Sequence, residues 1–157
     1  MKDATSNDRS EREKQYDLEE RLLDYSAAIV RLVERLPSTR AGNHVAGQLL
    51  RSGTSPFPNH GEGQAAESVD DFVHKFRVCL KEFRESRRWL LLILRVPMIR
   101  ETDDAKTLLA ETEELIKIFF SSIRTAQRNN QQERNAQRPT FNAQRSTFNK
   151  KRSPIER

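Results

Sequence analysis

The stretch DFVHKFRVCLKEFRESRRWLLLILR, residues 71–95, decides the fold class of this chain. Its large apolar side chains recur at intervals of three, four and seven residues, which is the spacing of one face of an α-helix. They are Phe72, Phe76, Leu80, Phe83, Leu90 and Leu94. Ser68, followed by Asp70 and Asp71, suits the start of such a helix, and Pro97 ends it. The stretch therefore predicts a long amphipathic helix over 68–95 that buries one face against other helices.

Three further helices are predicted around it, over residues 17–36, 39–52 and 102–127. Their inward residues follow the same helical spacing, and they are Leu18, Leu22, Tyr25, Ile29, Leu32 and Leu36 in the first, Val45, Ala46, Leu49 and Leu50 in the second, and Leu108, Leu115, Ile116, Phe119 and Ile123 in the last. Residues 53–63 hold two prolines and three glycines and predict a break, with a kinked continuation of the second helix as the alternative. Short connections between long helices favour an all-α, antiparallel up-and-down four-helix bundle over 16–128.

Both ends of the chain lack this apolar pattern. Residues 1–15 are charged, and residues 129–157 are rich in Asn, Gln and Arg, so we expect disorder in both. The tail contains a tandem seven-residue duplication, NAQRPTF (135–141) and NAQRSTF (142–148). It also carries the whole net charge of +5, because basic and acidic residues balance over 1–128. Alternating arginines and phenylalanines in the duplication suit single-stranded nucleic acid, and a solvated tail without function is the alternative.

The composition argues against an enzyme, a metalloprotein and a membrane protein. The single cysteine, Cys79, fits a reducing compartment. Asp71 and His74 have the spacing of a di-iron ligand pair, but no second pair exists, so we expect neither metal nor cofactor. No phosphate-binding loop and no nucleophile elbow occurs. The longest apolar run, 89–94, is too short to cross a bilayer, and the polar N-terminus is unlike a signal peptide. We therefore expect a cytoplasmic, non-enzymatic protein.

Several motifs resemble a known bacterial family. GQLLRSGTSP (47–56), NHGEGQAAES (59–68), and DFVHKF with LKEFRESRRWL (71–90) are similar to the four-helix-bundle proteins first named for intervening sequences of 23S ribosomal RNA genes. The resemblance covers about residues 16–127, and the family is related to the accessory variability determinant of diversity-generating retroelements. It implies a ring-shaped homopentamer, and in the retroelement relatives a pentamer that binds nucleic acid and partners a reverse transcriptase.

A basic ridge on the helix over 68–95 carries the functional prediction. Its five cations fall within a narrow sector opposite the apolar face, and they are Arg77, Lys81, Arg84, Arg88 and Arg95. Aligned over about 27 Å, they suit the repeated phosphates of RNA or DNA. In the alternative, the ridge is a solvated face on which Glu85 pairs with Lys81 or Arg88. The protein is then a protein-interaction scaffold whose acidic last helix, with Glu111, Glu113 and Glu114, covers the ridge.

Two further features predict packing rather than chemistry. Residues 89–94 are apolar all round the helix, and Phe120 adds a second apolar position beside Phe119. A bundle buries only one face of each helix, so we assign Trp89, Leu91, Leu92 and Phe120 to a subunit interface. Arg87 falls inside the apolar sector, where a lone charge would be costly. We therefore expect a structural ion pair with Glu62, or with Glu67 or Glu19.

Overall fold

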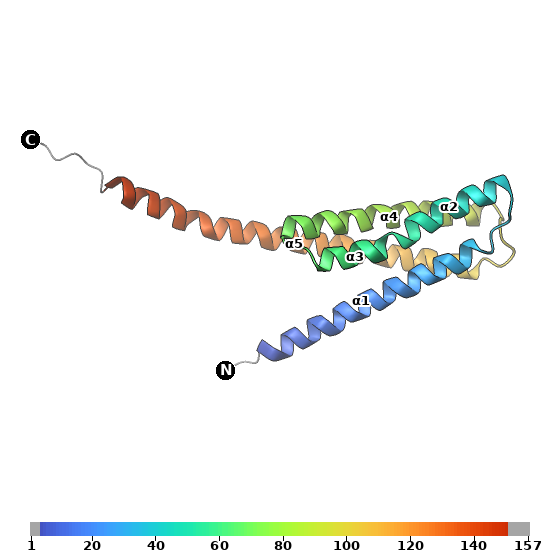
Figure 1. The fold of residues 1–157 in the computed structure, drawn as a ribbon, viewed down its shortest axis with the longest axis horizontal. Helices are drawn as coiled ribbons and strands as arrows, with labels where there is room; N and C mark the ends of the chain where they lie inside the picture. The colour runs from blue at the N-terminus through green and yellow to red at the C-terminus, as the bar shows by residue number, and fades with distance from the viewer. Residues whose placement is uncertain (1–3, 151–157) are drawn as a thin grey trace, which may run out of the picture.

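The computed structural model describes the backbone of residues 4–150 and the side chains of residues 18–136. This part of the chain consists of five α-helices and their connections, without a β-strand (Figure 1). The helices are α1 (Ala4–Val33), α2 (Arg40–Thr54), α3 (Pro56–Gln64), α4 (Val69–Arg95) and α5 (Asp103–Lys150). The prediction of an all-α fold is confirmed.

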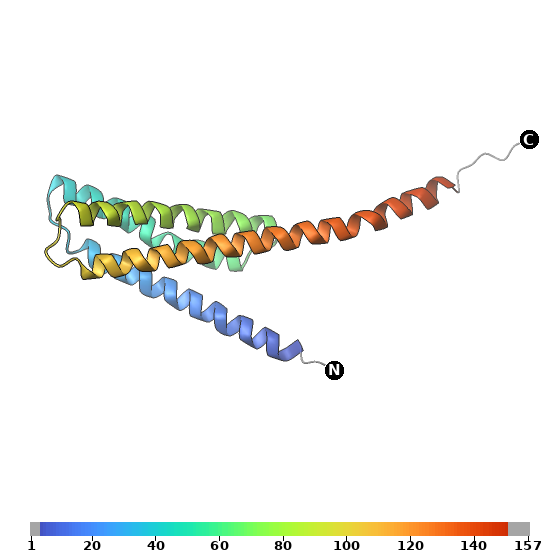
Figure 2. The ribbon, with the colours of Figure 1, turned by 180° about the vertical axis from the view of Figure 1, so that it is seen from behind.

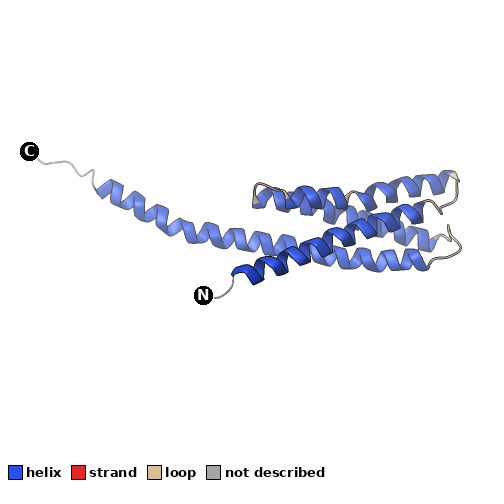
Figure 3. Cartoon of the chain, turned by 60° about the horizontal axis from the view of Figure 1, so that its bottom comes forward, coloured by secondary structure: helices blue, strands red, loops and turns tan. Residues whose placement is uncertain are grey.

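Helices α2 and α3 follow one another as a single bent arm, so the five helices form the four arms of an antiparallel bundle (Figures 1 and 3). Helix α4 packs against α5 on one side and against the α2–α3 arm on the other, and α1 packs against α2, α3 and α5. Hydroxyl caps begin two of the arms. Thr39 accepts a hydrogen bond from the backbone N–H of Gly42, and Ser68 accepts one from that of Asp71, both at 3.1 Å. The four-helix bundle is thus present in the chain, while the pentamer stays a prediction.

The Gly- and Pro-rich segment 53–63 is helical, with a bend at Ser55. Pro56 occupies the first turn of α3, where its missing N–H is tolerated, and the chain continues without reversing direction. The kinked continuation is therefore the correct alternative for this segment. Two of its three glycines, Gly53 and Gly63, serve close packing rather than turns. A Cβ on Gly53 would lie 2.8 Å from the Ile29 side chain, and one on Gly63 would lie 2.9 Å from the Phe76 ring.

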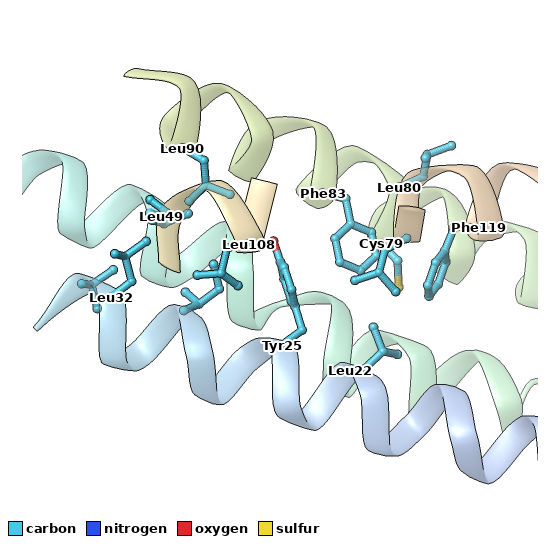
Figure 4. Close-up of a cluster of buried hydrophobic side chains, with 14 of the residues drawn as sticks. Leu22, Tyr25, Leu32, Leu49, Cys79, Leu80, Phe83, Leu90, Leu108 and Phe119 are labelled. Atoms are coloured by element: carbon cyan, nitrogen blue, oxygen red, sulfur yellow. The ribbon is translucent and has the colours of Figure 1, made fainter. Parts of the chain in front are cut away.

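The core lies between the four arms, and its buried apolar side chains come from the part of the chain between Leu22 and Ile123 (Figure 4). Its fully buried side chains come from every arm, and the largest include Leu22, Ile29, Leu49, Phe76, Phe83, Leu90, Leu115 and Phe119. Tyr25 of α1 crosses the core, packs edge-on against Phe83 at 5.6 Å and shares a 2.8 Å hydrogen bond with the hydroxyl of Thr112 in α5. Burial raises the pKa of Tyr25 to about 12, so this phenol stays neutral. Most of the predicted inward residues lie in this core, but Leu50 is exposed.

Helix replaces much of the disorder predicted at the two ends. Helix α1 begins at Ala4, within the predicted lead 1–15, and α5 continues to Lys150 through both copies of the duplication (Figure 2). Polar residues such as Glu, Gln, Arg and Lys have good helix propensity, and each extension grows from a helix that the bundle has already nucleated. Lack of apolar residues therefore does not prevent helix formation. The rest of both predicted segments, 1–3 and 151–157, lies outside the described residues.

Candidate nucleic-acid interface

Four of the five ridge cations line one groove between α4 and α5, with a volume of about 590 Å³. Arg77, Lys81, Arg84 and Arg88 are exposed on successive turns of α4. Residues three or four apart share a helix face, so these cations form a continuous line of about 17 Å. Arg95 is exposed in the last turn of α4 but does not line the groove. The structure therefore brings together the first four predicted residues and leaves the fifth apart.

Helix α5 forms the second wall of this α4–α5 groove. It contributes Phe120, Arg124 and Gln127, while Leu80 and Ile123 are nearly buried between the two helices and form the floor. Arg124 is thus a fifth groove cation, in addition to the four predicted ones on α4. Its spacing of four residues from Phe120 was the available signal, but it becomes meaningful only once α5 is known to lie beside the ridge.

No carboxylate neutralises the groove. Within residues 18–136, neither the four α4 cations nor Arg124 has a carboxylate within ion-pair distance. The acidic side chains expected to cover the ridge pair elsewhere. Glu85 binds Arg51 instead of Lys81 or Arg88. The three acidic residues of α5 that were predicted to cover the ridge pair as Glu111 with Arg21, Glu113 with Arg87 and Glu114 with Lys117. The groove is a basic surface without internal counter-charges.

An exposed aromatic ring lies inside this basic groove. Phe119 is fully buried, whereas the neighbouring Phe120 is 45 % exposed and lines the groove. The guanidinium carbon of Arg124 lies over the Phe120 ring, 5.8 Å from its centroid, within the range of a cation–π contact. Arg124 also lines an adjoining hollow on α5 together with Arg128. Phe120, predicted for a subunit interface, therefore sits among the cations.

The other predicted interface residues cluster near the C-terminal end of α4. Leu91 and Leu92 are each 39 % exposed, which agrees with unpartnered apolar positions. Trp89 is half-buried and already has partners within the chain. Its indole N–H donates to Oε1 of Glu85 at 3.4 Å, and its ring meets that of His44 edge-on at 5.8 Å. Of the predicted interface residues on α4, the two leucines are thus the ones that stay exposed, whereas Trp89 does not.

The predicted ion pair between Arg87 and Glu62 is wrong. Arg87 donates from Nε to Oε1 of Glu113 in α5 at 2.9 Å, and Glu62 instead pairs with Lys75. The error has a geometric cause. The large apolar residues of α4 mark only part of its buried sector, which also includes Cys79, Glu82 and Ser86, so the sector seemed to be centred closer to Arg87 than it is. Arg87 lies at the sector's edge and stays half-exposed.

The charge that α4 does bury is Glu82. It faces the α2–α3 arm on the same side as Cys79 and Ser86, whose small side chains allow a close approach. Its carboxylate lies 3.5 Å from Nη1 of Arg51, and one of its oxygens, Oε2, is buried without a hydrogen-bond partner. Next to it, Ser86 donates a 2.9 Å hydrogen bond to the Ser52 hydroxyl. This polar contact between α2 and α4 could not be found from apolar spacing.

Cys79 and the potential metal ligands are candidates for covalent or metal chemistry among the described residues. Burial raises the pKa of the Cys79 thiol to about 12, and the thiol donates to the Pro56 carbonyl at 3.5 Å, so it is a packing residue. The described residues hold no group of three or more His, Cys, Asp or Glu side chains placed to bind a metal ion. Both Asp71 and His74 are exposed. Among the described helices, none is long and apolar enough to cross a membrane.

The comparisons with known proteins concern the same helices. The sequence model of the 23S rRNA-intervening sequence proteins matches residues 14–121, which include the α4 side of the groove and Phe120. The chain belongs to this family. A crystal structure of an S23 ribosomal protein family member of unknown function, from Bacteroides thetaiotaomicron VPI-5482, superimposes with a TM-score of 0.62 at 30 % identity. The similarity covers 67 % of this chain and 96 % of that one. No curated protein matches the chain.

The family assignment agrees with the resemblance noted in the sequence, but the match covers only part of the groove. The match to the intervening-sequence family ends at residue 121, so Arg124, Arg128 and the extension of α5 lie beyond it. Any function of the groove must therefore be argued from its own residues.

Proposed function

We propose that this member of the 23S rRNA-intervening sequence family is a non-enzymatic protein that binds nucleic acid in the α4–α5 groove. One observation carries the proposal: five cations converge on one groove that contains no carboxylate. Lining up cations without counter-ions costs stability through mutual repulsion, and a bound polyanion relieves it. Repeated phosphates match the repeated turns of α4 better than a compact anion does.

The proposal predicts a particular dependence on salt. Contact with about four phosphates gives a slope of log affinity against log salt of about −3 for a single strand and somewhat steeper for a duplex. Fluorescence anisotropy of a labelled 20-nucleotide RNA or DNA, measured between about 50 and 200 mM salt, reports this slope.

The deciding variant replaces Arg77, Lys81, Arg84 and Arg88 by glutamine in the full chain. We expect its affinity to fall at least tenfold at low salt and its slope to approach that of the basic tail alone. The charge-matched control replaces four exposed cations outside the groove by glutamine, and these are Arg31, Arg40, Arg100 and Lys106. Equal affinity of the groove variant and wild type, or an equal loss in the control, contradicts the proposal.

Self-association forms the second part of the proposal. Leu91 and Leu92 are exposed apolar neighbours at one end of α4, and burial between subunits would remove them from water. In a ring of identical chains, as the resemblance implies, each groove would be repeated around the ring. A reverse transcriptase or another nucleic-acid enzyme is the proposed partner of such an assembly.

The scaffold alternative has less structural support. It required the acidic residues of the last helix to cover the ridge, and these residues pair with cations outside the groove. Its distinguishing outcome is co-purification of a protein partner together with indifference to nucleic acid.

A further inference from the structure

We propose that the α4–α5 groove selects single-stranded nucleic acid, because an unpaired base stacks on Phe120 while the cations of α4 hold the flanking phosphates. The inference rests on the proposed function and names its ligand class. It is carried by the juxtaposition of an exposed ring, an arginine over that ring and a line of unpaired cations in one groove.

Phe120 is not required by the core of the bundle. The preceding residue, Phe119, already fills the core, where it packs against Phe76 at 4.9 Å and Phe83 at 5.2 Å. Phe120 points away from this cluster and keeps 45 % of its surface exposed even with Arg124 above it. An exposed phenylalanine costs solubility, and this one lies where a ligand with a flat apolar face can cover it.

The surroundings of Phe120 match both the phosphate and the base of a nucleotide. Arg84, Arg88 and Arg124 line the same groove as the ring and supply positive charge for phosphates. The floor, made by Leu80 and Ile123, offers apolar surface next to it. Base stacking on aromatic rings beside arginines is the usual way in which proteins bind single strands.

A duplex fits the groove less well than a strand does. In a double helix the faces of the bases are stacked on one another, and proteins reach only base edges and phosphates. A duplex bound here would leave the exposed part of Phe120 and the apolar floor without a partner. An acidic protein segment would satisfy the cations, but it offers no flat ring for Phe120.

The test compares three ligands with the full-length protein: a labelled 20-nucleotide strand of mixed sequence, the duplex of that strand, and the same strand without bases. The abasic strand keeps the phosphates and removes stacking. DNA and RNA versions of the intact strand show which of the two nucleic acids the groove binds more tightly. We expect wild type to bind the intact strand about tenfold more tightly than the abasic strand, and more tightly than the duplex at equal salt.

Phe120→Ala should lower affinity for the intact strand by about tenfold and bind the intact and abasic strands equally. Phe120→Trp should keep the preference, because the larger ring also stacks. Leu50→Ala is the matched control, since Leu50 is 40 % exposed on α2, outside the groove. The abasic comparison separates loss of stacking from any loss of assembly, because it uses one protein and two ligands.

Several outcomes overturn the inference. If Phe120→Ala binds the intact strand as wild type does, or if wild type binds the duplex or the abasic strand equally well, no base stacks on Phe120. Binding that still depends on the four α4 cations would then leave the proposed function standing. If wild type binds a 20-residue poly-glutamate but no nucleic acid, both proposals fail.

Discussion

Arg51 of α2 lies against the buried carboxylate of Glu82 in α4, with 3.5 Å between Nη1 and Oε2. The same guanidinium also binds Glu85, one turn further along α4. Arg51 is 56 % exposed, whereas the Glu82 side chain is only 8 % exposed, so the arginine covers the carboxylate from the solvent side. A buried carboxylate depends strongly on such a partner, because water cannot replace it fully.

We expect Arg51→Ala to destabilise the bundle by about 1–3 kcal/mol, less than the loss of a partner from a fully buried pair, because Arg51 is partly exposed. The cost comes from the uncompensated charge of Glu82, so Arg51→Ala should cost much less in a Glu82→Gln background. Urea unfolding of the two single variants and the double variant measures this coupling. Arg40→Ala, at an exposed position of the same helix, is the control. Additive effects of the two substitutions would contradict the pairing.

The glycines of α3 predict opposite responses to one substitution. Gly63→Ala places a methyl group 2.9 Å from the Phe76 ring and should destabilise the protein by about 1–3 kcal/mol. Gly61→Ala meets nothing within 4 Å and should stabilise it by about 0.4–1 kcal/mol, because it restricts the unfolded chain. Both residues lie in one helix two positions apart, so each is the control for the other. Equal thermal midpoints would show that α3 does not pack closely against α4.

Apolar spacing was sufficient to predict the four arms, because burial of one face against other helices leaves a direct mark in the sequence. The spacing of Leu22, Tyr25 and Ile29, and that of Leu115, Phe119 and Ile123, correctly gave the buried faces of α1 and α5. The helical state of 53–63 was harder to predict. Glycine and proline disfavour helix on average, and only the neighbouring side chains show that Gly53 and Gly63 make room for packing.

Only the α4 side of the candidate site could be predicted from the sequence. The α4 cations share one helix, so their common face follows from the sequence alone. Arg124 belongs to another helix, and its place beside these cations depends on how α5 packs against α4. The periodicity of the sequence carries no information on this packing. The predicted pairing of Arg87 was also wrong. Its partner is Glu113, which lies across the α4–α5 contact, rather than Glu62, Glu67 or Glu19.

His60 should make stability depend on pH. Its ring is buried between Phe76 and Phe119, its Nε2 accepts from the Gln64 amide at 3.2 Å, and its Nδ1 is buried without a hydrogen-bond partner. Burial lowers the pKa of His60 below its ordinary value of 6.5, although Glu19 opposes the shift. Below pH 6.5 the unfolded chain therefore binds a proton that the folded chain does not, and the free energy of unfolding falls until the folded pKa is reached.

We expect a lower urea midpoint at pH 5.5 than at pH 7.5, and we expect His60→Phe to reduce this difference. The phenyl ring suits the aromatic surroundings and does not titrate. His74→Gln, at an exposed position of α4, is the control and should keep the wild-type pH dependence. The assignment fails if His60→Phe leaves the pH dependence unchanged, or if NMR titration finds the His60 pKa above 6.5.

Leu91 and Leu92 should determine whether the chain associates with itself. Each exposes 39 % of its surface, and burying such side chains against a neighbouring subunit is worth about 1 kcal/mol or more apiece. Replacing both by glutamate should shift the mass measured by light scattering toward the 18.3 kDa of a single chain. Val69→Glu is the matched control, because Val69 is also 39 % exposed but lies at the opposite end of α4. A wild-type protein that stays at 18.3 kDa at high concentration, or a double variant that keeps the wild-type mass, would show that these leucines are not a subunit interface.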